Sequence, residues 1–559
     1  MEDSGGRGYC YKGDNEMTSR EFLKNFLTRK EYIEKIRNSQ NCDILVVGGG
    51  IHGAAVAHLA ALNGLQTILL ERDDYASGTS SRSSKMAHGG LRYLEAFDFR
   101  QVFEGVKARE ELFRVANHIV SPEKFLVPIK KGNSWFKFKL GLGLSLYDLF
   151  LKTKEFKHRW ISAEASELSI FGRKRSDYQG GFIYADGILD DSRLVLDTIL
   201  AARQEGAICL NHALVKKIQQ QNGPRVVVKW TDQLTGNDYE TETGAVINCA
   251  GPWAPEVGDT KSLKALRKTM RYSQGTHILF NKPWIGPSLL LPLEEKGRYY
   301  FVWPHPAGTM VGTTERELVS ASESPLPQKD EIEEIYTRLE KDLPESGLNR
   351  ESAHYCFAGI RVLPIRKSKW GSSTASISRK HQWYFDRGVL SLVGGKLTTA
   401  FWTALEGLKI IAKMSELKEQ IVSAKKRNLP GAGDVSIFQN QFENLIKNKK
   451  VDPVLLQRAV ARYGVRINYF LEEDPTWLES IGGECLRGEL ELALDVEQAE
   501  NLEDVMNRRL GIQYMPGAGI NGLNEICEVL GKKRPKINLE EEMGKYKFKI
   551  NQIRELIGK

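Results

Sequence analysis

The stretch CDILVVGGGIHGAAVAHLAALNGLQTILLERDD, residues 42–74, decides the fold. It reads as an apolar strand, a group of glycines, an alanine-rich helix and a second strand that ends at Glu71. Gly48, Gly50 and Gly53 give the pattern G-x-G-x-x-G between the first strand and the helix. The first glycine permits a tight turn, the second lets the backbone approach a pyrophosphate, and the third lets the helix pack closely on the strand. The stretch therefore predicts a βαβ unit that binds a dinucleotide.

The sequence after Glu71 favours FAD over NAD as this dinucleotide. Glu71 stands where an acid would accept the ribose hydroxyls, and the helix N-terminus offers free N–H groups to the phosphates. An NAD domain would continue with another strand and helix, whereas here a long loop of small and hydroxyl residues follows, ASGTSSRSSKMAHGGLRY (76–93). Such a loop can run under a larger ring system. Two later glycine turns, in GAVINCAGPWA (244–254) and LSLVGGKLTTAF (390–401), can return to the same nucleotide.

These segments supply the predicted cofactor-binding residues. Lys396 and the helix N-terminus beside it would stabilise a reduced, anionic flavin. The full predicted set is Gly48, Gly50, Gly53, Glu71, Thr79, Ser80, Ser84, Lys85, His88, Gly89, Gly90, Gly251, Gly395, Lys396, Leu397 and Thr398.

The composition and the motifs of the chain limit which ligands other than FAD we expect it to bind. The net charge of +8 fits an anionic substrate or an anionic membrane surface, and it is too diffuse to indicate nucleic acid. The seven cysteines include no C-x-x-C pair, which argues against a zinc site. There is no H-E-x-x-H, EF-hand or Walker pattern, so we expect neither a metal nor ATP.

The 559 residues are too many for one core. We expect a solvated N-terminal extension over 1–40, with a short helix around Ser19 to Arg37. Residues 41–427 form an FAD-binding domain interleaved with a substrate domain, in which runs such as RVVVKW, THILF and YYFVW predict an antiparallel sheet. Residues 428–559 form a helical C-terminal domain. The fold class is α/β: a Rossmann-like FAD-binding domain of the glutathione-reductase type, an antiparallel-sheet substrate domain and an all-helical C-terminal domain.

Several motifs carry a resemblance to a known family. SSRSSKMAHGGLRYLE, NCAGPWA, GTTE, AGIRVL and VGGKLTT resemble the FAD-dependent glycerol-3-phosphate dehydrogenases, the aerobic, respiratory enzymes within the D-amino acid oxidase-like flavoproteins. The resemblance runs from about Asp43 to Thr403, and NLEDVMNRRLGI resembles the family's C-terminal domain. Two departures stand out: Glu315 replaces a usual aspartate in GTTE, and RRLG (508–511) replaces a usual RRT.

The resemblance implies oxidation of sn-glycerol 3-phosphate to dihydroxyacetone phosphate, with hydride transfer to flavin N5. It places His277, Arg361 and Lys396 in the catalytic set, and Arg92, Tyr93 and Arg379 in the substrate-binding set. The phosphate dianion calls for arginines with their bidentate fork. His277 is the preferred general base because its ordinary pKa lies nearest neutrality.

Other roles remain open for several of these residues. His277 lies inside a strand-like run and has the alternative of a core histidine. Arg361 has the alternative of a surface charge, and Tyr93 that of a packing residue. His88 has the alternatives of contacting the flavin backbone or holding the flavin covalently.

Residues 134–160, SWFKFKLGLGLSLYDLFLKTKEFKHRW, mix aromatic, leucine and lysine residues. A basic amphipathic stretch of this kind can lie on an anionic bilayer, and a buried helix with snorkelling lysines is the alternative. We therefore expect a cytoplasmic protein on the inner face of the cell membrane that passes electrons to a quinone. An oxidase that uses oxygen and yields hydrogen peroxide is the alternative. An amine or amino-acid oxidase and a flavoprotein with vestigial redox activity are further rivals. The C-terminal helices are candidates for contacts in a homodimer or with the membrane.

Overall fold

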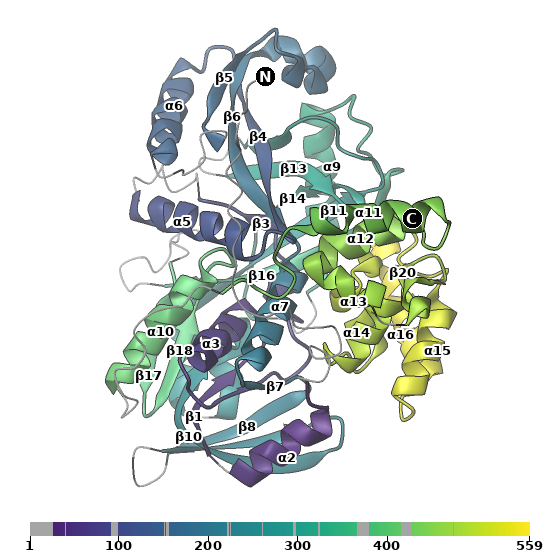
Figure 1. The fold of residues 1–559 in the computed structure, drawn as a ribbon. Coiled ribbons are helices and arrows are strands. Elements are labelled where there is room, and N and C mark those ends of the chain that lie inside the picture. Colours follow the sequence, from purple (N-terminus) through teal and green to yellow (C-terminus); the bar gives the residue numbers. More distant parts are fainter. Residues whose placement is uncertain are drawn as a thin grey trace, which may run out of the picture.

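The computed structural model describes residues 26–39, 41–90, 99–149, 151, 156–220, 223, 225–259, 261–293, 298–321, 325–365, 380–414, 427–472 and 474–559. These residues form two large sheets with helices packed around them, followed by a C-terminal group of helices (Figure 1).

The first sheet carries the glycine turn. Its five central strands are parallel, and their residues are mostly buried apart from the first half of β10 (Asn237–Asn248), which explains the apolar runs in the sequence. In spatial order they are β18 (Val389–Val393), β10, β1 (Asn41–Val47), β2 (Thr67–Leu70) and β7 (Ile208–Leu210). Strand β17 (Gln382–Asp386) extends the sheet antiparallel to β18. Strands β8 (Ala213–Gln220) and β9 (Val226–Asp232) form an antiparallel meander with β10.

Helix α3 (Ile51–Leu62) follows β1 and packs against α7 (Asp191–Gln204) and α10 (Ala400–Met414). The predicted helix from His52 to Asn63 is thus confirmed to within one residue. A Cβ atom at Gly53 would stand 1.8 Å from the Gly48 carbonyl oxygen. Only glycine lets the first turn of α3 come this close to the end of β1.

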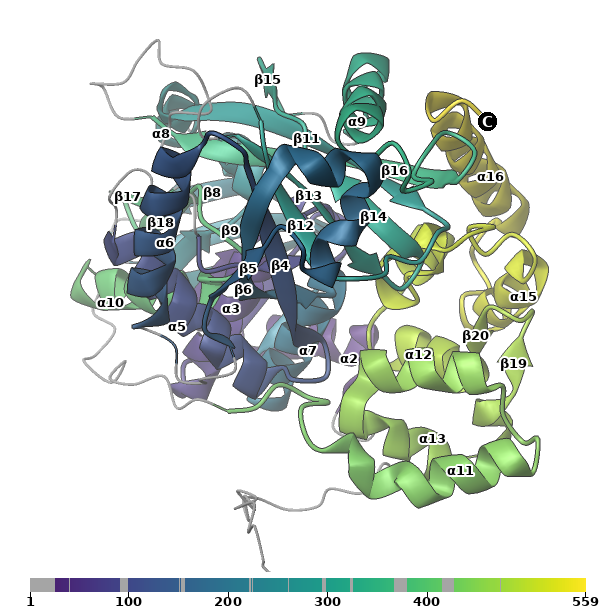
Figure 2. The same cartoon turned by 90° about the horizontal axis from the view of Figure 1, so that it is seen from above.

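The second sheet is mainly antiparallel, with one parallel pair, β12 with β4. Its ten strands are β3 (Met86–Ala87), β4 (Val120–Lys130), β5 (Arg159–Ser162), β6 (Tyr178–Leu189), β11 (Met270–Phe280), β12 (Ser288–Pro292), β13 (Tyr299–His305), β14 (Gly308–Gly312), β15 (Arg316–Leu318) and β16 (Ala353–Pro364). Helices α5 (Phe99–Val115), α6 (Ser134–Asp148) and α9 (Lys329–Asp342) lie around it (Figure 2).

The segment before the glycine turn differs from its prediction. Helix α2 covers Arg29–Ser39, later than the expected Ser19 to Arg37. Its Tyr32 and Ile36 are buried in the core beneath β8 to β10, and Arg29 pairs with the buried Asp232 at 2.6 Å. This part of the extension is therefore packed on the first sheet, and the expectation of a solvated segment is wrong for it. Apolar residues four apart on α2 were the missed signal.

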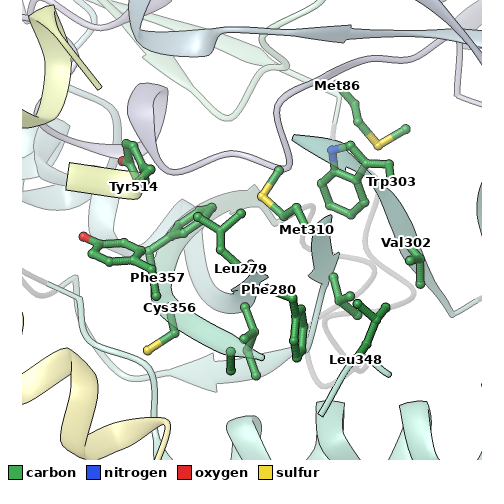
Figure 3. Close-up of a cluster of buried hydrophobic side chains, with 14 of the residues drawn as sticks. Met86, Leu279, Phe280, Val302, Trp303, Met310, Leu348, Cys356, Phe357 and Tyr514 are labelled. Carbon is green, nitrogen blue, oxygen red and sulfur yellow. The ribbon is translucent and has the colours of Figure 1, made fainter. Parts of the chain in front are cut away.

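The C-terminal part is mainly helical. Its α-helices are α11 (Gln439–Lys447), α12 (Pro453–Tyr463), α13 (Asn468–Glu472), α14 (Arg487–Asp495), α15 (Leu523–Lys533) and α16 (Leu539–Leu556). A pair of two-residue strands, Ser480–Ile481 with Cys485–Leu486, interrupts them. Its Tyr514 packs on Phe357 of the second sheet, with ring centroids 5.8 Å apart, and Figure 3 shows the two side chains in one apolar cluster. The predicted fold class is confirmed.

Asp74, three residues after Glu71, joins the first sheet to the C-terminal part. Its carboxylate accepts hydrogen bonds from Arg508 and Arg509, with Oδ1 2.8 Å from Nη2 of Arg509. All three side chains are buried. The arginines hold the pKa of Asp74 below its ordinary value against the opposing effect of burial. Removing one partner of such a group leaves buried charge without compensation, which is strongly destabilising.

We expect Asp74→Asn to lower the free energy of unfolding by about 3–5 kcal/mol, because it leaves two buried guanidinium groups short of their counter-ion. Asp330→Asn is the matched control, since Asp330 pairs with Arg316 in solvent, and its effect should be close to zero. Urea unfolding of the purified variants measures both. Equal, small effects would show that the buried ion pairs do not hold the two parts together.

Candidate active site

The carboxyl ends of the parallel strands surround a cavity of about 340 Å³. Three glycine turns form its wall: Gly48 and Gly50 after β1, Gly251 after β10, and Gly394 and Gly395 after β18. The loop after β2 closes another side, with Thr79 and Ser80 among its wall residues. Ligands of open parallel sheets bind at this end of the strands, so segments far apart in sequence converge where a nucleotide is expected.

Glu71 is the buried acid of this cavity. Its Oε2 accepts a hydrogen bond from the Gly49 N–H at 2.5 Å, and its Oε1 accepts one from the Asp73 N–H at 2.9 Å. Burial raises the pKa of Glu71 to about 7, although these two hydrogen bonds act in the opposite direction. Each carboxylate oxygen can accept a further hydrogen bond, so ribose hydroxyls can still be bound here.

The N-terminus of α3 faces the same space. None of the described side chains caps it at Gly50, although the Ile51 N–H donates to Ser80 Oγ at 3.0 Å. A Cβ at Gly50 would stand only 3.1 Å from that oxygen. The backbone here leaves room for a group that a side chain would fill, and the helix end favours a negatively charged one. These residues fit the pyrophosphate and ribose of FAD.

A smaller cavity of about 140 Å³ adjoins the first. Ser84, Met86, His88 and Arg361 line both cavities, so they stand at the junction. The other wall residues of the smaller cavity come mainly from the second sheet: Gly90, Tyr184, Asp186, Leu290, Arg298, Tyr299, Phe301, Thr313, Thr314 and Glu315. Charged and hydroxyl side chains gather here, as a small polar substrate requires.

His277 lies on β11 beside this junction, and its side chain is 1% exposed. Its ring stacks on Phe357 at 5.0 Å between centroids, and Ser84 Oγ lies 3.0 Å from its Nε2. Burial is the main cause that holds the pKa of His277 well below its ordinary value, and the charges of Arg361 and Lys85 add to the effect. The imidazole is therefore neutral near pH 7 and able to accept a proton.

The two predicted cations line the larger cavity from different elements. Arg361 on β16 donates from Nη2 to Thr313 Oγ1 at 2.6 Å. Lys396, after β18, donates from Nζ to Gln101 on α5 at 2.9 Å. These hydrogen bonds hold the two cationic groups at the wall of the cavity, where they can attract an anion.

Most of the predicted cofactor residues line one of the two cavities, and three do not. Gly53 packs against Gly48 within the turn. Lys85 forms a buried ion pair with Asp191. The Gly89 N–H donates to Asp186 at 2.9 Å. The wall residues are Gly48, Gly50, Glu71, Thr79, Ser80, Ser84, His88, Gly251, Gly395, Lys396, Leu397 and Thr398 in the larger cavity, and Gly90 in the smaller. Arg92, Tyr93 and Arg379 lie outside the described residues, and their roles stay predictions.

Sequence reasoning missed Arg298 and Trp253. Arg298 lines the smaller cavity, with its Nε 3.9 Å from Glu315. Trp253 lines the larger one, where its ring would collide with a Cβ at Gly78. An arginine directly before the apolar run YYFVW was the available signal for Arg298. For Trp253 the available signal was its place in the motif NCAGPWA, which follows a predicted buried strand.

Asp74, His212 and Asp504 bring three potential metal-ligand atoms within 4.8 Å of one another. Their carboxylates already bind Arg508 and Arg509. The guanidinium groups supply the positive charge that a metal ion would bring, so this cluster is an ion-pair network.

Comparison with known proteins gives the class. The family model of FAD-dependent oxidoreductases matches residues 43–402, and the model of the C-terminal domain of alpha-glycerophosphate oxidase matches 422–535. Within this class, the chain belongs to the family of aerobic glycerol-3-phosphate dehydrogenases. The enzyme of Staphylococcus haemolyticus is 31% identical over 454 residues, which cover 78% of this chain and 81% of that protein. The enzyme of Staphylococcus aureus is 27% identical over 506 residues, 87% and 89% of the two chains.

Solved structures agree on the fold. The glycerol-3-phosphate dehydrogenase of Bacillus halodurans, complexed with FAD, has a TM-score of 0.72 at 22% identity and covers 94% of this chain and 97% of its own. The L-alpha-glycerophosphate oxidase of Mycoplasma pneumoniae, with FAD bound, has a TM-score of 0.52 at 17% identity and covers 66% and 94%. The predicted family and the predicted cofactor, FAD, are confirmed.

We expect FAD affinity to rise with pH below about 7. Ribose hydroxyls donate to an ionised Glu71, and burial raises the pKa of this group to about 7 in the protein without cofactor. Below that pH Glu71 must lose a proton before FAD binds. The dissociation constant of FAD should therefore grow about tenfold for each unit by which the pH falls. Fluorescence titration of apoprotein with FAD from pH 5.5 to 8 measures the slope. Glu71→Gln should bind more weakly and without this pH dependence, and the same slope in that variant would exclude Glu71 as its cause.

Proposed function

We propose that the protein oxidises sn-glycerol 3-phosphate to dihydroxyacetone phosphate and passes the electrons to a quinone. One observation carries the proposal: Ser84 and Arg361 stand where the larger cavity joins the smaller one, His277 is hydrogen-bonded to Ser84, and Arg298 lines the smaller cavity. This arrangement can hold an anionic alcohol and remove its hydroxyl proton. The names of the related enzymes support the substrate.

The residues of this chain divide the work. Arg361 and Arg298 line the smaller cavity and attract the substrate's phosphate and hydroxyl oxygens. His277 is the proton acceptor for the C2 hydroxyl. Lys396 faces the larger cavity and supports the flavin. The flavin, when bound, accepts the hydride that leaves C2. Arg92, Tyr93 and Arg379 remain proposed partners of the phosphate.

A quinone is the proposed acceptor, and oxygen is the second candidate because the C-terminal part matches the domain of an oxidase. An anaerobic experiment tests the substrate, and reoxidation of the reduced enzyme then distinguishes the two acceptors. Glycerol 3-phosphate should bleach the flavin absorbance of the holoenzyme, and glycerol, which lacks the phosphate, should not. Failure to bleach would eliminate the proposed substrate. Faster reoxidation by a water-soluble quinone than by air would support the first acceptor, and the reverse would support an oxidase.

We expect Arg361→Ala to slow this bleaching at low substrate by about 10- to 150-fold. A hydrogen bond to a charged group contributes about 1.5–3 kcal/mol, and about 1.4 kcal/mol is a factor of ten. Arg361→Lys should remain impaired because lysine offers no planar fork. Arg267→Ala, in an exposed ion pair with Glu256, is the control. Normal FAD content combined with wild-type kinetics in Arg361→Ala would remove Arg361 from the site.

Peripheral membrane association on the inner face of the cell membrane is part of the proposal. Helix α6 exposes an apolar stripe of Trp135, Phe138, Leu142 and Leu149, which are 55–75% exposed. Their spacing of three, four and seven residues puts them on one helix face. Exposed lysines flank the stripe, among them Lys131 and Lys139. An apolar stripe beside positive charge suits an anionic bilayer surface. Among the residues that the structure describes, no helix is long and apolar enough to cross a membrane.

We expect the double variant Trp135→Ser, Phe138→Ser to lose affinity for anionic vesicles by on the order of 100- to 10,000-fold, because each of the two apolar side chains contributes roughly 1.5–3 kcal/mol when buried. The control replaces Ile285 and Val319, which are exposed outside α6, with serine. Sedimentation with anionic and neutral vesicles at low and high salt measures binding. Salt-insensitive binding to both kinds of vesicle would contradict the proposed surface.

A further inference from the structure

Ser84 lies at the junction of the two cavities and is hydrogen-bonded to His277. Its side chain is partly exposed and lines both cavities, whereas His277 lines only the larger one. His277 is 1% exposed, with Phe357 stacked on its ring and Trp303 at 5.9 Å between ring centroids. Of these two side chains, only Ser84 reaches the wall of the smaller cavity.

The hydrogen bond between the two side chains makes a proton path. Ser84 Oγ lies 3.0 Å from Nε2 of His277, which is within the range of an ordinary hydrogen bond. The other ring nitrogen, Nδ1, is buried and has no hydrogen-bond partner among the described residues. Nε2 is thus the ring nitrogen that is linked to a wall residue of both cavities, Ser84.

We propose that Ser84 relays the proton of the substrate hydroxyl to His277. This inference rests on the proposed function. The C2 hydroxyl gives its proton to Ser84 Oγ while the Ser84 proton moves to Nε2. The C2 hydrogen leaves with its electron pair in the oxidation already described, and the C2–O bond becomes a carbonyl. One proton ends on His277, and Ser84 regains its hydroxyl, so atoms and electrons balance.

The surrounding charges fit this step. The charged groups that act on His277 are Arg361 on β16 and Lys85 in the loop beside Ser84, and both disfavour a protonated ring. Lys85 is already neutralised by Asp191. A phosphate dianion held at Arg361 brings opposite charge into the site, which favours the protonated ring. His277 is therefore a stronger base when substrate is present, and the relay works in the loaded site.

A set of variants tests the relay by stopped-flow reduction of the holoenzyme. We expect Ser84→Ala to slow flavin bleaching at saturating glycerol 3-phosphate by on the order of 100-fold, at the lower end of general acid–base effects. FAD content and the substrate concentration at half-maximal rate should stay near wild type. Ser84→Thr, which keeps the hydroxyl, should recover most of the rate. Ser288→Ala is the matched control, because Ser288 is a buried serine of the second sheet that hydrogen-bonds Glu123.

Two readouts separate a relay from a structural role. Groups that act as a unit give non-additive losses, so adding Ser84→Ala to His277→Asn should cost almost nothing more. In ¹⁵N-histidine NMR, assigned with His277→Asn, the Nε2 resonance of His277 should shift in Ser84→Ala and not in Ser288→Ala. The NMR readout is independent of the proposed substrate, because the shift is measured without it.

Three results would overturn the relay. Ser84→Ala would bleach at the wild-type rate, the rate losses of Ser84→Ala and His277→Asn would multiply in the double variant, or the Nε2 resonance of His277 would not shift in Ser84→Ala. Loss of FAD from Ser84→Ala and Ser84→Thr alike would also overturn it, in favour of a role in holding the cofactor. If wild-type enzyme is not bleached by glycerol 3-phosphate while the Nε2 resonance shifts as expected, the proposed substrate fails and the Ser84–His277 contact stands.

Discussion

The carboxylate of Asp74 is the point on which the arrangement of the two ends of the chain depends. It lies three residues beyond Glu71 and is bound by Arg508 and Arg509, more than 430 positions later. A buried carboxylate without cations, or two buried guanidinium groups without a carboxylate, would cost several kcal/mol. Arg508 has a second carboxylate partner, Asp504, whereas among the described residues Arg509 forms its ion pair with Asp74 alone.

The contact extends along the same loop and fixes the cofactor site from behind. The Tyr75 hydroxyl donates to the side chain of Gln498, and Asn211 donates both to Asp74 and to the Gln498 carbonyl. The residues that follow Glu71, the predicted ribose-binding acid, are thus hydrogen-bonded to the C-terminal part. Its helices do more than cover the second sheet: they complete the shell that positions Glu71.

The charged groups at the junction of the cavities differ from the ion pairs around Asp74. Arg361 donates hydrogen bonds to oxygens of Thr313 and Thr314 and lies near His277, whose pKa is held well below its ordinary value mainly by burial. In the proposed reaction this arginine attracts an anionic substrate. The carboxylate of Asp74, in contrast, is satisfied by arginines of the protein itself.

The sequence predicted the parts of the molecule that depend on local geometry. Gly48, Gly50 and Gly53 define a turn whose shape follows from residues a few positions apart, and Glu71 follows from the length of one βαβ unit. Most of the predicted cofactor residues line the larger cavity for the same reason. Arg298 and the partners of Asp74 were not found, because their role comes from contacts between strands and helices hundreds of residues apart. No spacing rule encodes such contacts.

The same distinction explains His277. Its residue type and its place in a strand-like run left a base and a core histidine equally consistent with the sequence. The structure accounts for both descriptions: the ring is packed as tightly as a core residue, yet it lines the larger cavity, and its Nε2 lies 3.0 Å from Ser84 Oγ. In the proposed reaction, a side chain held by its neighbours keeps its geometry while the proton moves, which lowers the reorganisation that the reaction requires.

A comparable connection runs from the site to the surface. Asp186 accepts hydrogen bonds from the Gly89 N–H, from the Tyr147 hydroxyl on α6 and from Arg109 on α5. A Cβ at Gly89 would stand 2.2 Å from the Tyr147 oxygen, so the loop and the helix touch directly. Any displacement of α6 must either carry the loop at Gly89 with it or break these buried hydrogen bonds. Since His88 and Gly90 line the smaller cavity on either side of Gly89, the helix that exposes the apolar stripe and the wall of the substrate space form one mechanical unit.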